Sequence, residues 1–161
     1  MIKKIGIMVF LFCLAWTIFG QNINGYSDLA FGTTLDNFLS EYEGFRSVNP
    51  GADLTNKGVV AYRRIDGRFD RGRSVNLLFY ENKFYEALVQ YINPSSNEIS
   101  QILRNYVNQY GRPNNEERAG GRYPWVKYIW NINDRFIITA FIQSSLEISH
   151  YDPTIKNKID N

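Results

Sequence analysis

The chain has 161 residues, of which 44% are hydrophobic and 21% charged, a composition typical of one globular domain. It contains 18 basic and 16 acidic residues, one histidine and one cysteine. These counts exclude an internal disulfide, a zinc site built from cysteine and histidine, and a strongly basic nucleic-acid-binding protein.

The first 20 residues have the organisation of a cleavable signal peptide. Lys3 and Lys4 give a positive start, residues 5–19 are uncharged and mostly apolar, and Gly20 is a small residue at the exit. A retained membrane anchor is the second choice, because a spanning helix needs roughly 20 apolar residues. We expect cleavage after Gly20, or alternatively after Ala15. The product would be exported, periplasmic or secreted, without a stable membrane anchor.

Cleavage would also change what the composition means. Cys13 lies in the middle of the apolar run and follows Phe12, where a lipoprotein signal needs a small residue, so we expect Cys13 to be lost with the signal. Without Lys3 and Lys4, the remaining basic residues equal the 16 acidic ones in number. No nucleic-acid binding is therefore expected, and export without disulfides fits a bacterial envelope.

The first half of the mature chain is predicted to contain a helix followed by three strands. Residues 21–28 form a polar leader, and Thr33 and Thr34 can cap a helix whose apolar residues are Leu35, Phe38, Leu39 and Tyr42. Residues 45–58 are rich in turn formers and are expected to be a loop. Alternating β-branched and aromatic residues predict strands at 59–65, 75–80 and 84–91.

The second half repeats this order. Ser95 and Glu98 form a capping box before an amphipathic helix that ends at Gly111, ahead of Pro113. Residues 114–121 are polar and are expected to be a loop. Three further strands are predicted at 123–132, 135–143 and 146–151, and residues 153–161 are expected to be a flexible tail.

The element order αβββ-αβββ indicates a single α+β domain over residues 29–152. We expect a curved antiparallel sheet of about six strands with both helices packed on one face. The other face of such a sheet is open to solvent unless a partner covers it. The repeated order also raises the possibility of an internal duplication.

Three short segments resemble the fold of β-lactamase inhibitor proteins and of small exported bacterial proteins built in the same way. They are Phe31-Gly32-Thr33 before the first helix, Tyr110-Gly111-Arg112-Pro113 after the second, and Trp130-Asn131-Ile132-Asn133-Asp134 in the late hairpin. The resemblance implies a duplicated helix-plus-antiparallel-sheet unit. Those inhibitors carry disulfides, which this chain cannot form, so the resemblance assigns no binding residues.

The sequence predicts no catalytic residue, metal site or cofactor. His150 is the only histidine, and no nucleophile motif precedes it. The neighbouring acids Glu41/Glu43 and Glu116/Glu117 are typical of a solvated surface rather than of a catalytic pair. Two alternatives stay open, namely a small envelope hydrolase acting on glycan or peptide and a purely structural envelope component.

Two features predict binding instead. Segment 62–73 is rich in arginine, whose planar guanidinium binds carboxylate or phosphate and stacks on aromatic rings. The candidate binding residues in this segment are Arg63, Arg64, Arg68, Phe69, Arg71 and Arg73. The late hairpin adds Trp125, Tyr128 and Trp130. We expect an exported, non-catalytic domain that recognises an envelope protein or an anionic ligand. The competing interpretation of the arginines is an ordinary solvated hairpin whose charges prevent aggregation.

Overall fold

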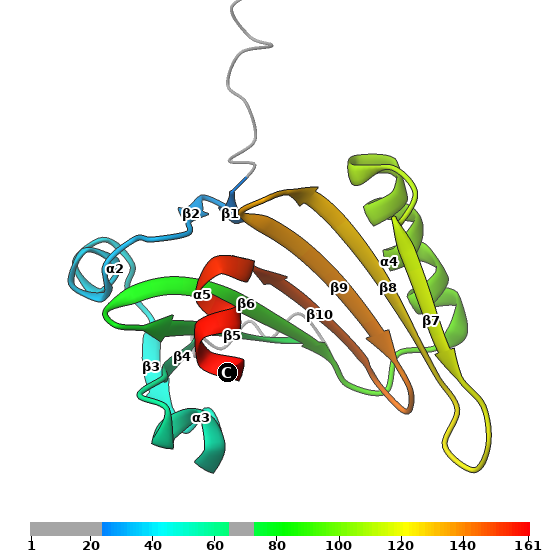
Figure 1. Ribbon diagram of the computed structural model, residues 1–161, viewed down its shortest axis with the longest axis horizontal. Coiled ribbons are helices and arrows are strands. Elements are labelled where there is room, and N and C mark those ends of the chain that lie inside the picture. Colours follow the sequence, from blue (N-terminus) through cyan, green and yellow to red (C-terminus); the bar gives the residue numbers. More distant parts are fainter. Residues whose placement is uncertain (1–23, 65–72) are drawn as a thin grey trace, which may run out of the picture.

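An eight-stranded antiparallel sheet organises the computed structural model of the protein, which describes residues 24–64 and 73–161 (Figure 1). The strands lie in the order β3-β4-β5-β6-β10-β9-β8-β7. Their bounds are β3 Phe45–Val48, β4 Val60–Arg64, β5 Arg73–Tyr80, β6 Lys83–Tyr91, β7 Asn115–Ala119, β8 Trp125–Asn133, β9 Phe136–Ile142 and β10 Leu146–Tyr151. A separate two-stranded hairpin consists of β1 (Gly25–Tyr26) and β2 (Leu29–Ala30).

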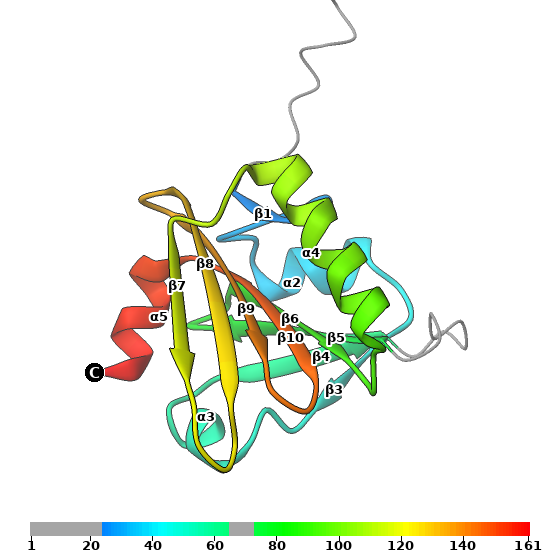
Figure 2. The ribbon, with the colours of Figure 1, turned by 90° about the vertical axis from the view of Figure 1, so that its right-hand side faces the viewer.

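Helices flank the sheet on both sides. Helix α2 (Leu35–Glu41), helix α4 (Ser96–Tyr110) and the β1–β2 hairpin lie on one side, which we call the α4 side. Helix α3 (Ala52–Asn56) and helix α5 (Pro153–Asp160) lie on the other, which we call the α5 side (Figure 2). The α+β class and the antiparallel sheet are as predicted, but the described residues form eight strands in the main sheet rather than about six.

The two main helices begin where the sequence signals place them. The Thr34 side chain accepts a hydrogen bond from the Asn37 backbone N–H at the start of α2. Ser95 and Glu98 form the predicted capping box at the start of α4. Each cap satisfies backbone donors that have no partner within the helix, which is why these short polar side chains mark the helix starts.

Each half of the chain supplies four neighbouring strands. Strands β3–β6 form one half of the sheet and β7–β10 the other, and the last strands, β6 and β10, pair at the centre with His150 opposite Ala87. The sequence prediction of three strands per half missed β3 and β7. Both strands are short and lie at the edges of the sheet, so their composition is as polar as that of loops. The predicted loop 45–58 in fact contains β3 and α3, and the predicted loop 114–121 contains β7.

Buried apolar clusters lie on both sides of the sheet. On the α4 side, one cluster surrounds Phe38 under α2 and another surrounds Trp130 and Ile148 under α4; Phe31 and Val75 pack against both. On the α5 side, a smaller cluster contains five buried residues, namely Val59, Ala61, Leu78, Tyr85 and Ile159. The core on the α4 side is therefore continuous across the two halves.

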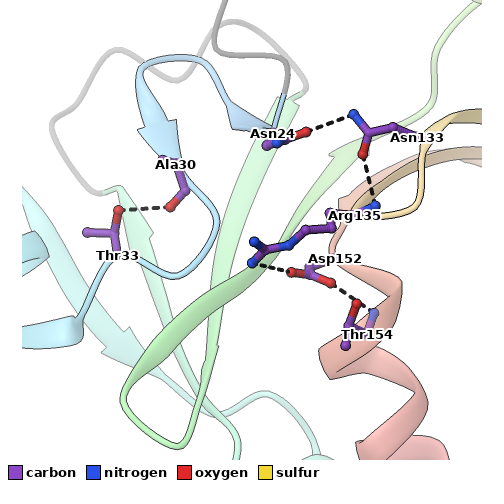
Figure 3. Close-up of polar contacts among 7 residues, drawn as sticks. All are labelled: Asn24, Ala30, Thr33, Asn133, Arg135, Asp152 and Thr154. Carbon is purple, nitrogen blue, oxygen red and sulfur yellow. Dashed lines mark hydrogen bonds and ion pairs between the residues drawn. The ribbon is translucent and has the colours of Figure 1, made fainter.

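The C-terminal segment is a packed helix, not the flexible tail expected for residues 153–161. Asp152 is buried and accepts a hydrogen bond from the Thr154 backbone N–H, with Pro153 in the first turn (Figure 3). Its second carboxylate oxygen lies 3.6 Å from the Arg135 guanidinium. Ile159 is buried in the α5-side core. The segment is polar overall, but these contacts dock it on the sheet.

The N-terminal part of the structure ties the β1–β2 hairpin to the sheet. The Asn133 side-chain amide, at the end of β8, donates to the Asn24 side-chain oxygen over 2.9 Å (Figure 3). The Gly32 backbone N–H donates to the Phe84 carbonyl of β6 over 2.8 Å, and the Thr33 hydroxyl donates locally to the Ala30 carbonyl over 2.8 Å. The predicted signal peptide lies outside the described residues. Within the described ranges, no helix has the length and hydropathy needed to cross a membrane.

Candidate functional site

The predicted arginine candidates are divided between the two sides of the sheet. Arg68, Phe69 and Arg71 lie outside the described residues. Arg63 lies on the α5 side, where its Nε donates to the Asn76 side-chain oxygen over 2.7 Å. Arg64 is exposed and follows the alternation of β4 onto the α4 side. Arg73 also lies on the α4 side, so the described arginines do not form one patch.

The aromatic candidates are divided in the same way. Trp130 is 1% exposed and its indole N–H donates to the Gly111 carbonyl over 2.9 Å, so it belongs to the core rather than to a binding surface. Tyr128 packs against Trp130 with ring centroids 6.2 Å apart. Trp125 is on the α5 side, where its ring lies 5.6 Å from that of Phe141. Of the three aromatic candidates, only Trp125 is placed to contact a partner from the α5 side.

Trp125 belongs to a surface that we call the open face. The open face is the α5 side of strands β7–β10, because α3 and α5 lie over the β3–β6 half of the sheet (Figure 1). Strand alternation and the pairing register place half-buried side chains there; the set comprises Trp125, Lys127, Ile129, Thr139, Phe141, Glu147 and Ser149.

Charges of both signs surround the aromatic pair of the open face. Lys127 pairs with Phe141 in the register of β8 and β9, and its ammonium lies 3.7 Å from the Glu117 carboxylate on β7. On the other side, Phe141 pairs with Glu147 of β10. An aromatic centre with charged neighbours is the usual composition of a surface that recognises proteins.

His150 is buried among aromatic side chains. Its side chain is 5% exposed on the α4 side and its Nε2 lies 2.8 Å from the Tyr106 hydroxyl. Ser149, the adjacent strand residue, faces the opposite side of the sheet, so these two cannot form a nucleophile–base pair. Burial and, second, the positive charge of Arg73 lower the pKa of His150 to about 4, so the imidazole is neutral at pH 7. No group of three His, Cys, Asp or Glu side chains in the described part of the chain could hold a metal ion.

A second group of polar and aromatic side chains includes Arg73 and four residues that the sequence analysis did not name as candidates. Arg73, Tyr26, Tyr91, Tyr106 and His150, which we call the seam cluster, gather on the α4 side where the two halves of the sheet meet. The sequence contained a signal for part of it. Arg73 shares the strand alternation of apolar residues that face the helices, namely Val75, Leu77 and Phe79, and this pattern separates Arg73 from the arginines before it.

The open face and the seam cluster are thus two candidate sites on opposite sides of one sheet. The open face is broad and combines aromatic and charged groups, whereas the seam cluster is partly buried and combines hydrogen-bond donors with one positive charge. No family model, curated protein or solved structure matches the chain.

Proposed function

We propose that the protein is an exported, non-catalytic binding domain that recognises a protein partner through its open face. The observation that carries the proposal is the Trp125–Phe141 pair, 5.6 Å between ring centroids, on a part of the sheet that α3 and α5 leave uncovered. Large aromatic side chains supply most of the energy in protein interfaces, because they bury much apolar area at a low cost in conformational entropy.

The charges around this pair favour a protein over a nucleic acid. Lys127 is paired with Glu117 at 3.7 Å, and Glu147 lies beyond Phe141, so the face carries both signs. A nucleic-acid site would present mainly basic side chains to the phosphates. Paired charges at the rim of an aromatic centre orient a protein partner and reject others.

Arg63 lies on the same side of the sheet but far from Trp125. Strands β4 and β8 are separated by β5, β6, β10 and β9, which at about 4.8 Å per strand spacing places these residues about 24 Å apart across the sheet. Arg63 is on the half of the sheet that α3 and α5 cover, so it is not part of the open face, and Trp125 is the anchor of the proposed interface.

The test places a photoreactive amino acid at Thr139, in the middle of the open face, or at Gln101, exposed on α4. The full chain is expressed in its own cells and irradiated. We expect a discrete cross-linked protein from position 139 and none from position 101. Mass spectrometry of the same material should give a mature chain that begins at Gln21.

Matched variants connect the cross-link to the aromatic pair. Trp125→Ala should reduce the cross-link by about tenfold or more, as expected for loss of a central aromatic anchor, and Trp125→Phe should retain most of it. Equal cross-linking from positions 139 and 101, or a cross-link unaffected by Trp125→Ala in a folded variant, would contradict recognition through the open face.

A further inference from the structure

The seam cluster occupies a defined place between the two halves of the molecule. Arg73 pairs with Tyr91 across β5 and β6, and His150 lies on β10, which pairs with β6. Tyr26 reaches the cluster from the β1–β2 hairpin, and Tyr106 reaches it from α4. The Tyr26 ring lies 5.1 Å from the His150 ring in an edge-on arrangement, while the Tyr26 hydroxyl accepts a hydrogen bond from Arg73.

Arg73 carries a positive charge into this partly buried place. Its guanidinium lies 5.9 Å from the centroid of the Tyr91 ring, and its Nε–H is buried with no hydrogen-bond partner in the described structure. No ion pair joins Arg73 to a carboxylate within residues 24–64 and 73–161. Burial alone would lower the pKa of Arg73, but the tyrosine oxygens around it, Tyr26 first, outweigh burial and raise it. The group therefore stays charged.

The Tyr106–His150 pair leaves a second donor unpaired. A neutral imidazole and a phenol carry one polar hydrogen each, and the single hydrogen bond between them, 2.8 Å long, uses only one. One donor remains whichever tautomer is present. When the Tyr106 hydroxyl donates to Nε2, that donor is the His150 Nδ1–H, an atom that is buried without a partner among the described residues.

We propose that the seam cluster is a binding site for a small monocarboxylate, which accepts hydrogen bonds from Arg73 and from the Tyr106–His150 pair. Buried donors without acceptors are costly, and so is a half-buried cation that has no counter-ion among the described residues. One carboxylate group relieves both costs. A guanidinium and a carboxylate match in geometry as well as in charge.

The charge and the walls of the cluster select the class of anion. One guanidinium with neutral donors balances one negative charge, which suits a carboxylate better than a phosphate of nearly two charges. Tyr26, Tyr106 and Phe136 surround the imidazole with rings. The ligand therefore has an apolar body beside its carboxylate, and is either a free aromatic or aliphatic acid or the C-terminus of a peptide. The inference does not rest on the proposed function, because the open face is on the other side of the sheet.

The experiment uses the full mature chain and benzoate as the probe, and NMR follows the Arg73 Nε–H resonance together with the backbone amide resonances of Tyr26, Tyr106 and His150, which remain in every variant. We expect a saturable shift of these resonances at millimolar benzoate. Arg73→Met should abolish binding, and Arg63→Met, on the opposite side of the sheet, should leave it unchanged. If Arg73→Met does not fold, Arg73→Lys keeps the charge without the Nε–H and should bind about tenfold more weakly.

Further arms separate the sources of the carboxylate. A short peptide with a free C-terminus is compared with the same peptide carrying a C-terminal amide. Binding of the free form only identifies a peptide C-terminus as the ligand, whereas binding of benzoate but of neither peptide identifies a free acid. Both results support the site. The site is overturned if no carboxylate shifts the Arg73 resonance, if Arg63→Met weakens binding as much as Arg73→Met, or if inorganic phosphate binds as tightly as benzoate.

Discussion

At the scale of single residues, His150 makes the stability of the fold depend on pH. Burial, followed by the Arg73 charge, lowers its pKa from 6.5 to about 4 in the folded state. The unfolded chain therefore takes up the proton first, and protonation favours unfolding. We expect this contribution to be complete above about pH 6.5 and to be lost as the pH falls to about 4, on the order of 3 kcal/mol in total.

Urea denaturation of wild type and His150→Gln between pH 4 and pH 7.5 measures this contribution. Glutamine can still hydrogen-bond to Tyr106 but does not titrate in this range. The carboxylates titrate in both proteins, so their contribution cancels in the difference between the two unfolding free energies. Parallel pH profiles for the two proteins would show that His150 is not held neutral by its surroundings.

From the sequence, strand alternation predicts which residues of a strand share a face, but not which face is buried. Alternation places Trp125 and Trp130 on opposite faces, because residues five apart in a strand face opposite sides. It could not say which of these sides the helices cover. Both tryptophans and Tyr128 were therefore equal candidates, and only the packing of α4 on Trp130 assigns that residue and Tyr128 to the core.

At the scale of elements, α5 depends on one buried side chain at its start. Asp152 is 1% exposed, and one carboxylate oxygen accepts from the Thr154 N–H over 2.8 Å. The other oxygen is buried with only a 3.6 Å contact to Arg135, which is itself mostly exposed. We expect Asp152→Ala to cost about 1–3 kcal/mol, because it removes the cap. Asp152→Asn keeps an oxygen at the cap and should cost about 1 kcal/mol or less.

Chemical denaturation gives these costs, and amide hydrogen exchange shows where they act. Exchange in α5 should accelerate in Asp152→Ala and stay near the wild-type rate in Asp152→Asn. Equal losses in both variants would mean that the negative charge, rather than the cap, holds the helix.

Element prediction was accurate for α2, α4 and the central strands, but it missed the edge strands β3 and β7 and the helices α3 and α5. Strands β5, β6, β9 and β10 are buried on at least one face, so their composition is distinctive. Strand β7 has the sequence Asn115-Glu116-Glu117-Arg118-Ala119, with one neighbour and no fully buried residue. Its strand conformation depends on pairing with β8, which local composition does not encode.

At the scale of the whole molecule, we expect the two halves to unfold as one unit, because the β6–β10 pairing joins them and Val75 and Phe31 pack into both clusters on the α4 side. Trp125 and Trp130 both lie on β8, so in a chain that begins at Gln21 tryptophan fluorescence reports on the second half. Leu77→Ala removes buried side-chain volume from the first half, at an expected cost of about 2–5 kcal/mol. If the halves are coupled, this variant lowers the fluorescence midpoint in urea as much as the circular dichroism midpoint. A fluorescence midpoint that stays at the wild-type value while the dichroism signal shifts would mean that each half folds on its own.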